Sequence, residues 1–161
     1  MLEIAIDRDQ PAAEFYADLT SFAAALVEGE PDAIANMANI AALIWQYMPD
    51  LNWAGFYRRI DDELVLGPFQ GKTACIRITI GAGVCGTAAA TGQVQRVADV
   101  HAFPGHIACD ADSRSELVVP VVKNGKIVAV LDLDSPLPGR FLPEDEAGMV
   151  ALIGAIAANL G

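Results

Sequence analysis

The sequence predicts an α+β fold, with a central and mainly antiparallel sheet flanked by N- and C-terminal helices. Two apolar patterns of helical spacing open the chain, several short alternating segments occupy the middle, and one more helical pattern closes it. Strands that follow one another, rather than alternating with helices, are typical of an antiparallel sheet. The 161 residues fit one domain spanning 1–161, which buries roughly two-thirds of its unfolded surface.

The helices are predicted from the spacing of apolar residues and from the residues that end each run. Residues 11–27 place apolar side chains three and four positions apart, and Gly29 ends this pattern. A second helix starts at residues 31–32 and runs to about Met48. Residues 84–91 form a short alanine-rich helix closed by Gly92, and Pro143 with three following acids opens the last helix.

The strands are predicted from alternation and from the turns between them. Residues 52–59, 63–66 and 75–80 form the first three strands, and residues 94–100 form a short extended piece. Asn124-Gly125 is the strongest short hairpin signal and joins strands at 116–122 and 126–135. Residues 101–115 have no periodicity, and a loop of that length in a compact domain is usually functional.

The charge of the chain excludes two classes of partner. Lys and Arg number 10 against 21 Asp and Glu, giving a net charge of −11 and a pI near 4.3. Nucleic acids and anionic membranes attract the opposite sign, so we expect neither as a partner. The first ten residues are acidic rather than basic, and the longest uncharged run, residues 147–161, is too short to cross a bilayer. We therefore expect no targeting segment and a cytoplasmic protein.

A glycine-rich turn fits the pattern G-x-G-x-x-G at residues 81–86. A dinucleotide site also needs a longer crossover helix and an acidic residue about 20 positions on, and Asp99 and Asp112 are misplaced for that role. Two alternatives remain. The turn lets the backbone approach a neighbouring segment, or its N–H groups at the helix start hold a small carboxylate.

His101, His106 and Cys109 in the long loop are residue types that bind metals. A structural zinc site usually adds a second pair of ligands at short spacing, which the sequence lacks, so we expect no metal. The alternative is that both histidines make ordinary hydrogen bonds, or that one of them helps to ionise Cys109.

The chain has three cysteines, whereas a disulfide scaffold of this length would have more cysteines and an even number of them. Free cysteine is commonly an inert buried residue. However, Cys109 lies in a polar loop, Cys75 opens a strand, and Cys85 stands at a helix start, where the helix dipole is expected to lower the thiol pKa. Inert thiols and redox-active thiols both remain open on this basis.

Asp132 and Asp134 are two apart in a strand and therefore share a face. Paired carboxylates repel, so one can keep its proton and serve as an acid; the alternative is a solvated edge strand. A regular two-residue hairpin pairs Ser115 with Asp134 and Leu117 with Asp132, which turns Glu116 to the other face. Convergence of the three acids needs a bulge, or a Glu116 that still belongs to the loop, and a proline in the partner strand favours an irregularity.

Six segments together resemble the free methionine-(R)-sulfoxide reductase family, whose members are single-domain GAF proteins. They are residues 67–71, 74–76, 83–88, 100–110, 115–120 and 131–136. The resemblance covers nearly the whole chain and implies a GAF-like fold. It implies an oxidoreductase that reduces free L-methionine-(R)-S-oxide without metal or organic cofactor and is recycled by thioredoxin.

The resemblance also implies roles for individual residues. Cys109 is the nucleophile, Cys75 resolves its sulfenic acid as a disulfide, and Cys85 is the auxiliary third thiol. Glu116, Asp132 and Asp134 match the acidic residues of the site, and Trp53 and Tyr57 match an aromatic wall for the S-methyl group. The substrate carboxylate would suit the N–H groups near Val84 and Cys85.

Two further expectations concern the assembly and the alternative function. GAF domains commonly pair through helices, and the apolar terminal helices here predict a homodimer. The runner-up function is a non-catalytic GAF module that senses a small molecule or redox state.

Overall fold

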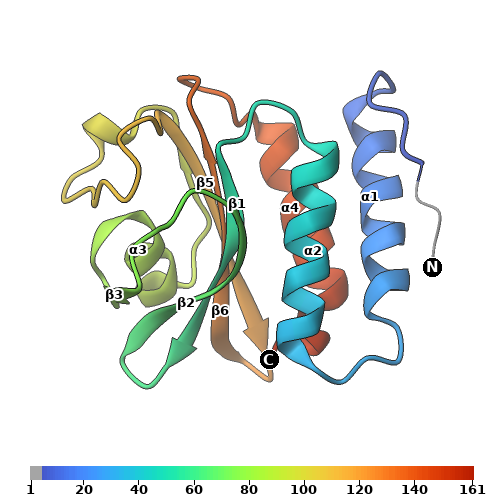
Figure 1. Cartoon of the computed structure of the whole chain (residues 1–161), viewed down its shortest axis with the longest axis horizontal. Helices are drawn as coiled ribbons and strands as arrows, with labels where there is room; N and C mark the ends of the chain where they lie inside the picture. The colour runs from blue at the N-terminus through green and yellow to red at the C-terminus, as the bar shows by residue number, and fades with distance from the viewer. Residues whose placement is uncertain (1–4) are drawn as a thin grey trace.

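The computed structural model describes residues 5–161 as a six-stranded sheet with helices on both faces (Figure 1). The elements in chain order are α1 (Ala12–Val27), α2 (Ala33–Tyr47), β1 (Trp53–Ile60), β2 (Glu63–Gly71), β3 (Arg77–Thr79), α3 (Gly83–Thr91), β4 (Gln95–Val97), η1 (Val100–Ala102), β5 (Ser115–Lys123), β6 (Lys126–Ser135), α4 (Pro143–Ile156) and η2 (Ala157–Asn159). Within residues 5–161, no helix combines the length and hydropathy that crossing a membrane requires.

The sheet has the strand order β3-β2-β1-β6-β5-β4, and every neighbouring pair is antiparallel. The expected α+β class with an antiparallel sheet is therefore confirmed. α2 packs on β1 and β2, α4 packs on β5, and α1 packs against both helices from outside. α3 lies on the opposite face, against β5 and β6 (Figure 1).

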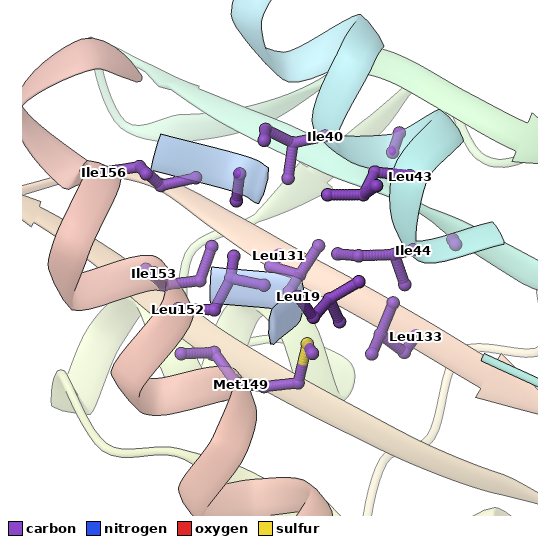
Figure 2. Close-up of a cluster of buried hydrophobic side chains, with 14 of the residues drawn as sticks. Leu19, Ile40, Leu43, Ile44, Leu131, Leu133, Met149, Leu152, Ile153 and Ile156 are labelled. Carbon is purple, nitrogen blue, oxygen red and sulfur yellow. The ribbon is translucent and has the colours of Figure 1, made fainter. Parts of the chain in front are cut away.

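The larger hydrophobic core lies between the sheet and α1, α2 and α4 (Figure 2). Leu131 and Leu133 of β6 point into it and are fully buried, so the alternate residues of this strand face α3. α1 and α4 approach closely at Gly148, where an added Cβ would lie 2.1 Å from the ring of Tyr16. The face covered by α1, α2 and α4 is thus a close-packed layer, and the side chains available for a site lie on the face that carries α3.

A smaller core lies between the sheet and α3. Its buried members include Trp53 and Tyr57 from β1, Val84 and Cys85 from α3, and Val118 from β5. α3 is short and ends at Gly92, which adopts the left-handed conformation that favours glycine. Because α3 covers only part of this face, the long loops on either side of it complete the layer (Figure 1).

The β5–β6 hairpin contains the bulge that convergence of the acids requires. The pairing passes from Val122 with Ile127 to Val121 with Ala129, so Val128 is passed over. The regular register, with Ser115 opposite Asp134, is wrong. Instead Glu116 lies opposite Asp134 and Val118 lies opposite Asp132, which brings all three acids to the face that carries α3.

Two strand predictions differ from the structure. The second strand does not end at residue 66 but continues to Gly71, because its outer half pairs with β1. The strand expected at residues 75–80 is only Arg77–Thr79. Its first residue, Cys75, belongs to a connecting segment whose position is determined by side chains from β1.

Candidate active site

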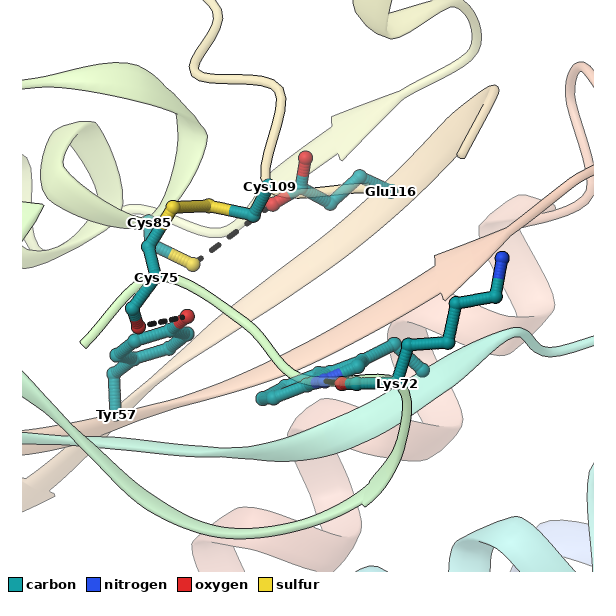
Figure 3. The surroundings of a disulfide bond; sticks show 7 residues. Tyr57, Lys72, Cys75, Cys85, Cys109 and Glu116 are labelled. Atoms are coloured by element: carbon teal, nitrogen blue, oxygen red, sulfur yellow. Dashed lines mark hydrogen bonds between the residues drawn. A yellow bond between two sulfur atoms is a disulfide. The ribbon is translucent and has the colours of Figure 1, made fainter. Parts of the chain in front are cut away.

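Cys75 and Cys109 form a disulfide, with Cα atoms 5.6 Å apart and a sequence separation of 34 (Figure 3). Cys75 lies in the strap, which we define as residues 72–76 between β2 and β3, and Cys109 lies in the loop at residues 103–114. The indole of Trp53 donates to the carbonyl of Lys72 at 3.1 Å, and the hydroxyl of Tyr57 donates to the carbonyl of Cys75 at 3.0 Å. β1 therefore fixes the strap that carries one of the two bonded cysteines.

The strap and the 103–114 loop also meet through an ion pair. Lys72 Nζ lies 2.6 Å from Asp112 and 3.8 Å from Asp110. Behind the loop, the side-chain amide of Asn52 donates to Asp110 at 3.3 Å and to Ser113 at 3.1 Å. Sequence reasoning missed these contacts, since nothing in the spacing of the residues links positions 52, 72 and 112.

A cavity of about 40 Å³ lies beneath the disulfide. Its walls include all of the expected site residues except Cys75, which is bonded to a wall residue. The lining residues are Trp53, Tyr57, Thr73, Ala74, Ile78, Ala82, Gly83, Val84, Cys85, His106, Ile107, Cys109, Asp110, Ser113, Glu116, Asp132 and Asp134. The structure thus brings the three cysteines, the three acids and the two aromatic residues to one place.

The aromatic wall consists of three rings on the sheet. The ring of Trp53 stacks on Tyr57 at 5.7 Å between centroids and on Phe69 at 5.2 Å. Trp53 and Tyr57 are both buried. Flat apolar faces of this kind accommodate a small apolar group such as a methyl.

Burial dominates the electrostatics of the three acids. Glu116 and Asp132 are buried, and loss of solvent raises the pKa of Asp132 to about 6. Burial, followed by the charge of Asp132, raises the pKa of Glu116 and of Asp134 well above the ordinary value. At neutral pH this favours one ionised carboxylate, Asp132, beside two protonated ones.

Cys85 is buried and its thiol donates a hydrogen bond to Glu116 Oε1 at 3.8 Å (Figure 3). Burial first, and then the charges of Asp132 and Glu116, raise the pKa of this thiol well above its usual value. The expectation that the start of α3 lowers this pKa is therefore wrong, because desolvation and neighbouring carboxylates outweigh the helix dipole.

The glycine-rich turn folds back on itself before α3. The N–H of Gly81 donates to the carbonyl of Gly86 at 2.8 Å, and an added Cβ at Gly86 would lie 2.6 Å from the carbonyl oxygen of Thr79. This is the close backbone approach that the sequence left open. The first N–H groups of α3, at Gly83, Val84 and Cys85, lack partners within the helix and lie at the cavity wall.

The loop histidines and Cys109 are not brought together as a metal site. The sulfur of Cys109 is bonded to Cys75, and the rings of His101 and His106 meet edge to face with centroids 6.5 Å apart. Among residues 5–161, one group places three potential metal-ligating atoms within 4.8 Å of one another: Cys85, Glu116 and Asp132.

Comparison with known proteins identifies the family. A family model described as GAF domain matches residues 34–160. The chain is 56% identical over 143 residues to the free methionine-R-sulfoxide reductase of Escherichia coli (strain K12), covering 89% of this chain and 87% of that one. The chain belongs to the free methionine-R-sulfoxide reductase family. The resemblance noted from the sequence and the GAF fold are both confirmed.

Solved structures of the free methionine-R-sulfoxide reductase family are similar over the whole fold. The enzyme of Neisseria meningitidis in complex with its substrate is 39% identical, with a TM-score of 0.94, covering 99% of this chain and 96% of that one. The reduced form of the Staphylococcus aureus protein is 48% identical, with a TM-score of 0.87, covering 91% and 95%.

Proposed function

We propose that this chain reduces free methionine-(R)-sulfoxide to methionine by thiol chemistry, with Cys109 as the nucleophile and Cys75 as the resolving thiol. Family membership supports the reaction. The observation that carries the assignment of thiols is the Cys75–Cys109 disulfide above a cavity lined by acids and aromatic rings. Cys85, buried and hydrogen-bonded to Glu116, is a poor nucleophile by comparison.

Each end of the substrate has a matching part of the cavity. The ionised Asp132 suits the substrate ammonium, and the free N–H groups of Val84 and Cys85 suit its carboxylate. Trp53 and Tyr57 would hold the S-methyl group. At about 40 Å³ the cavity beneath the disulfide has room for only a few water molecules, so substrate entry follows reduction of the disulfide.

The proposed reaction uses Cys109, Glu116 and Cys75 in turn. The Cys109 thiolate attacks the sulfoxide sulfur, the oxygen is transferred to Cys109 as a sulfenic acid, and methionine leaves. Glu116, protonated and at the cavity wall, supplies a proton to the oxygen as the S–O bond weakens. The Cys75 thiol then attacks the sulfenic sulfur, releasing water and forming the disulfide.

The partners in this proposal follow from the chemistry of the disulfide. Two electrons must return to Cys75 and Cys109 after each turnover, and thioredoxin is the dithiol donor that we infer. The thiols supply both electrons, so the reaction needs no metal or organic cofactor. A thioredoxin-linked cycle fits a reducing compartment, which supports a cytoplasmic location.

A homodimer is the last part of the proposal. An apolar groove between α1 and α4 is lined mainly by small side chains, including Ala13, Ala17, Ala147 and Ala151. Small side chains permit close packing of helices, which supports pairing of two copies at this surface. Light scattering during gel filtration would give a mass of two chains if the proposal holds and of one chain if it fails.

The two sulfoxide epimers test the proposed reaction. Reduced protein with thioredoxin and its reductase should convert the R epimer of free methionine sulfoxide, and the S epimer should remain. Equal activity on both epimers, or none on R, would contradict the proposal. If the protein is instead a non-catalytic sensor, a stoichiometric amount of methionine sulfoxide should not oxidise its thiols.

The assignment of thiols has its own test. One equivalent of R epimer without reductant should lower the intact mass by about 2 Da, the two hydrogens lost in a disulfide. The new bond should join peptides containing Cys75 and Cys109. The Cys109→Ser variant should be inactive, and full activity in that variant would overturn the choice of nucleophile.

A further inference from the structure

We propose that Cys85, Glu116 and Asp132 form a binding site for Zn²⁺ inside the cavity where we place the substrate. The three side chains come from three different elements, α3, β5 and β6, and meet at the cavity wall. All three are buried, with exposed fractions of 4%, 5% and 6%. The packing of α3 on the sheet therefore holds the donor atoms in place before an ion arrives.

The spacing of the donor atoms fits a tetrahedral ion. One ligating atom from each residue lies within 4.8 Å of the other two, and Cys85 Sγ lies 3.8 Å from Glu116 Oε1. Zn–S and Zn–O bonds of about 2.3 and 2.1 Å at a tetrahedral angle place sulfur and oxygen about 3.6 Å apart. The site thus needs little movement to accept zinc at these two atoms.

An unpaired oxygen in the same cluster gives independent support. Asp132 Oδ1 is buried and has no hydrogen-bond partner among the described residues. A buried carboxylate oxygen without a donor or cation is energetically unfavourable. The orphaned atom belongs to one of the three proposed ligands, so an ion bound there would give this oxygen a partner.

The donor set selects the kind of ion. A thiolate favours zinc over magnesium or calcium, which prefer oxygen ligands alone. Three protein ligands leave a fourth position, which water takes in open zinc sites. The cavity of about 40 Å³ has room for an ion with a water molecule. On binding, Zn²⁺ displaces the thiol proton of Cys85 and the carboxyl proton of Glu116, and both protons pass to solvent.

The location makes zinc a competitor of the substrate. Asp132 and Glu116 cannot bind the substrate ammonium or donate a proton while they ligate an ion. This consequence rests on the proposed function, whereas zinc binding itself does not.

The oxidised protein offers a clean test, because Cys85 is then its free thiol. Co²⁺ serves as the spectroscopic probe, and thiolate ligation gives a sulfur-to-cobalt absorption band in the near ultraviolet. We expect this band at one ion per chain, its loss in Cys85→Ser, and displacement of Co²⁺ by Zn²⁺ but not by Mg²⁺. Calorimetry should show zinc affinity lowered at least about tenfold in Cys85→Ser and Asp132→Asn. Removal of a residue that only contacts a zinc ligand already lowers metal affinity by about 10–100-fold.

Controls separate the outcomes. Glu144→Gln removes an exposed carboxylate from α4 and should leave zinc affinity unchanged. Protection of Cys85 from a thiol reagent by Zn²⁺ in the wild-type protein supports the site without any variant. An absent cobalt band, or equal zinc affinity in wild type and a folded Cys85→Ser, overturns it. In the reduced protein, whose cavity the substrate can enter, zinc binding that free methionine fails to weaken overturns the overlap with the substrate cavity. If the protein proves to lack reductase activity, the cobalt band is still expected, because metal binding does not depend on the proposed function.

Discussion

Glu116 lies directly opposite Asp134 across the β5–β6 ladder because the hairpin passes over Val128. Without this bulge the side chain of Glu116 would point to the helix-covered core, among Leu131 and Leu133. One unpaired residue therefore determines that Glu116 joins Asp132 and Asp134 at the cavity wall. The electrostatic properties of the site follow from this register, since burial, and then the charge of Asp132, raises the pKa of both Glu116 and Asp134.

Glu116→Gln should lower kcat by about 10²–10⁴ with a smaller effect on thermal stability, because it removes the proposed proton donor and keeps its shape. Steady-state kinetics on the R epimer and thermal melts measure the two effects. Asp62→Asn, which changes an exposed acid in the β1–β2 turn, is the matched control. A Glu116→Gln enzyme with wild-type kcat would move the proton donor to another group.

Asp132→Asn should make the protein more resistant to urea at neutral pH. The pKa of Asp132 is raised to about 6 in the folded protein by burial, and the unfolded chain ionises near the ordinary value of about 3.9. Between these values the unfolded state releases its proton first, so stability falls as pH rises from about 4 to about 6. The amide that replaces the carboxyl group does not ionise, so the variant lacks this loss. Above pH 6 its free energy of unfolding should exceed that of the wild-type protein by about 1–3 kcal/mol.

The same variant should show no such gain below pH 4, where both states of the wild-type protein bind the proton. Urea unfolding of wild type and variant at a series of pH values tests this difference in slope. Parallel curves for the two proteins would contradict the assigned pKa direction.

Lys72→Ala should slow formation of the Cys75–Cys109 disulfide, because the Lys72–Asp112 ion pair joins the strap to the 103–114 loop. Both side chains are exposed and the pair is screened by solvent, so we expect a slowing of no more than about fivefold. Stopped-flow measurement after one equivalent of substrate gives the rate, and added salt should reduce the difference. Arg77→Ala breaks the exposed pair with Glu63 elsewhere on the sheet and should leave the rate unchanged.

Gly148→Ala and Gly154→Ala lie in the same helix and should change stability in opposite directions. An added methyl at Gly148 meets the Tyr16 ring at 2.1 Å, whereas nothing lies within 4 Å of the same methyl at Gly154. We expect Gly148→Ala to destabilise by about 1–3 kcal/mol. Gly154→Ala should stabilise by about 0.5–1 kcal/mol through helix propensity. Equal effects in denaturant unfolding would contradict the close packing of α1 on α4.

The elements of the fold were largely predictable from local patterns. The helices followed from apolar spacing, and the β5–β6 hairpin followed from Asn124-Gly125. The need for a bulge could be argued from the positions of the acids, yet its place at Val128 could not, because bulge position depends on packing against other strands.

The environment of the site was less accessible from sequence. The start of α3 suggested an acidic Cys85 thiol, but burial and two carboxylates distant in sequence reverse the direction. The Lys72–Asp112 pair joins residues 40 apart in the chain through exposed side chains. Such contacts depend on how loops meet in space, and neither periodicity nor spacing records them.

The Cys75–Cys109 bond also has a topological consequence. It closes β3, α3 and β4 into a covalent ring, with a sequence separation of 34 between its ends. A ring of this size removes chain entropy from the unfolded state worth about 3–4 kcal/mol. The oxidised protein should thus unfold less readily than the reduced one. When reductant is scarce, the protein accumulates in the oxidised form, which is the more stable against unfolding. Reduction of the disulfide returns it to the less stable form that has both thiols free to react.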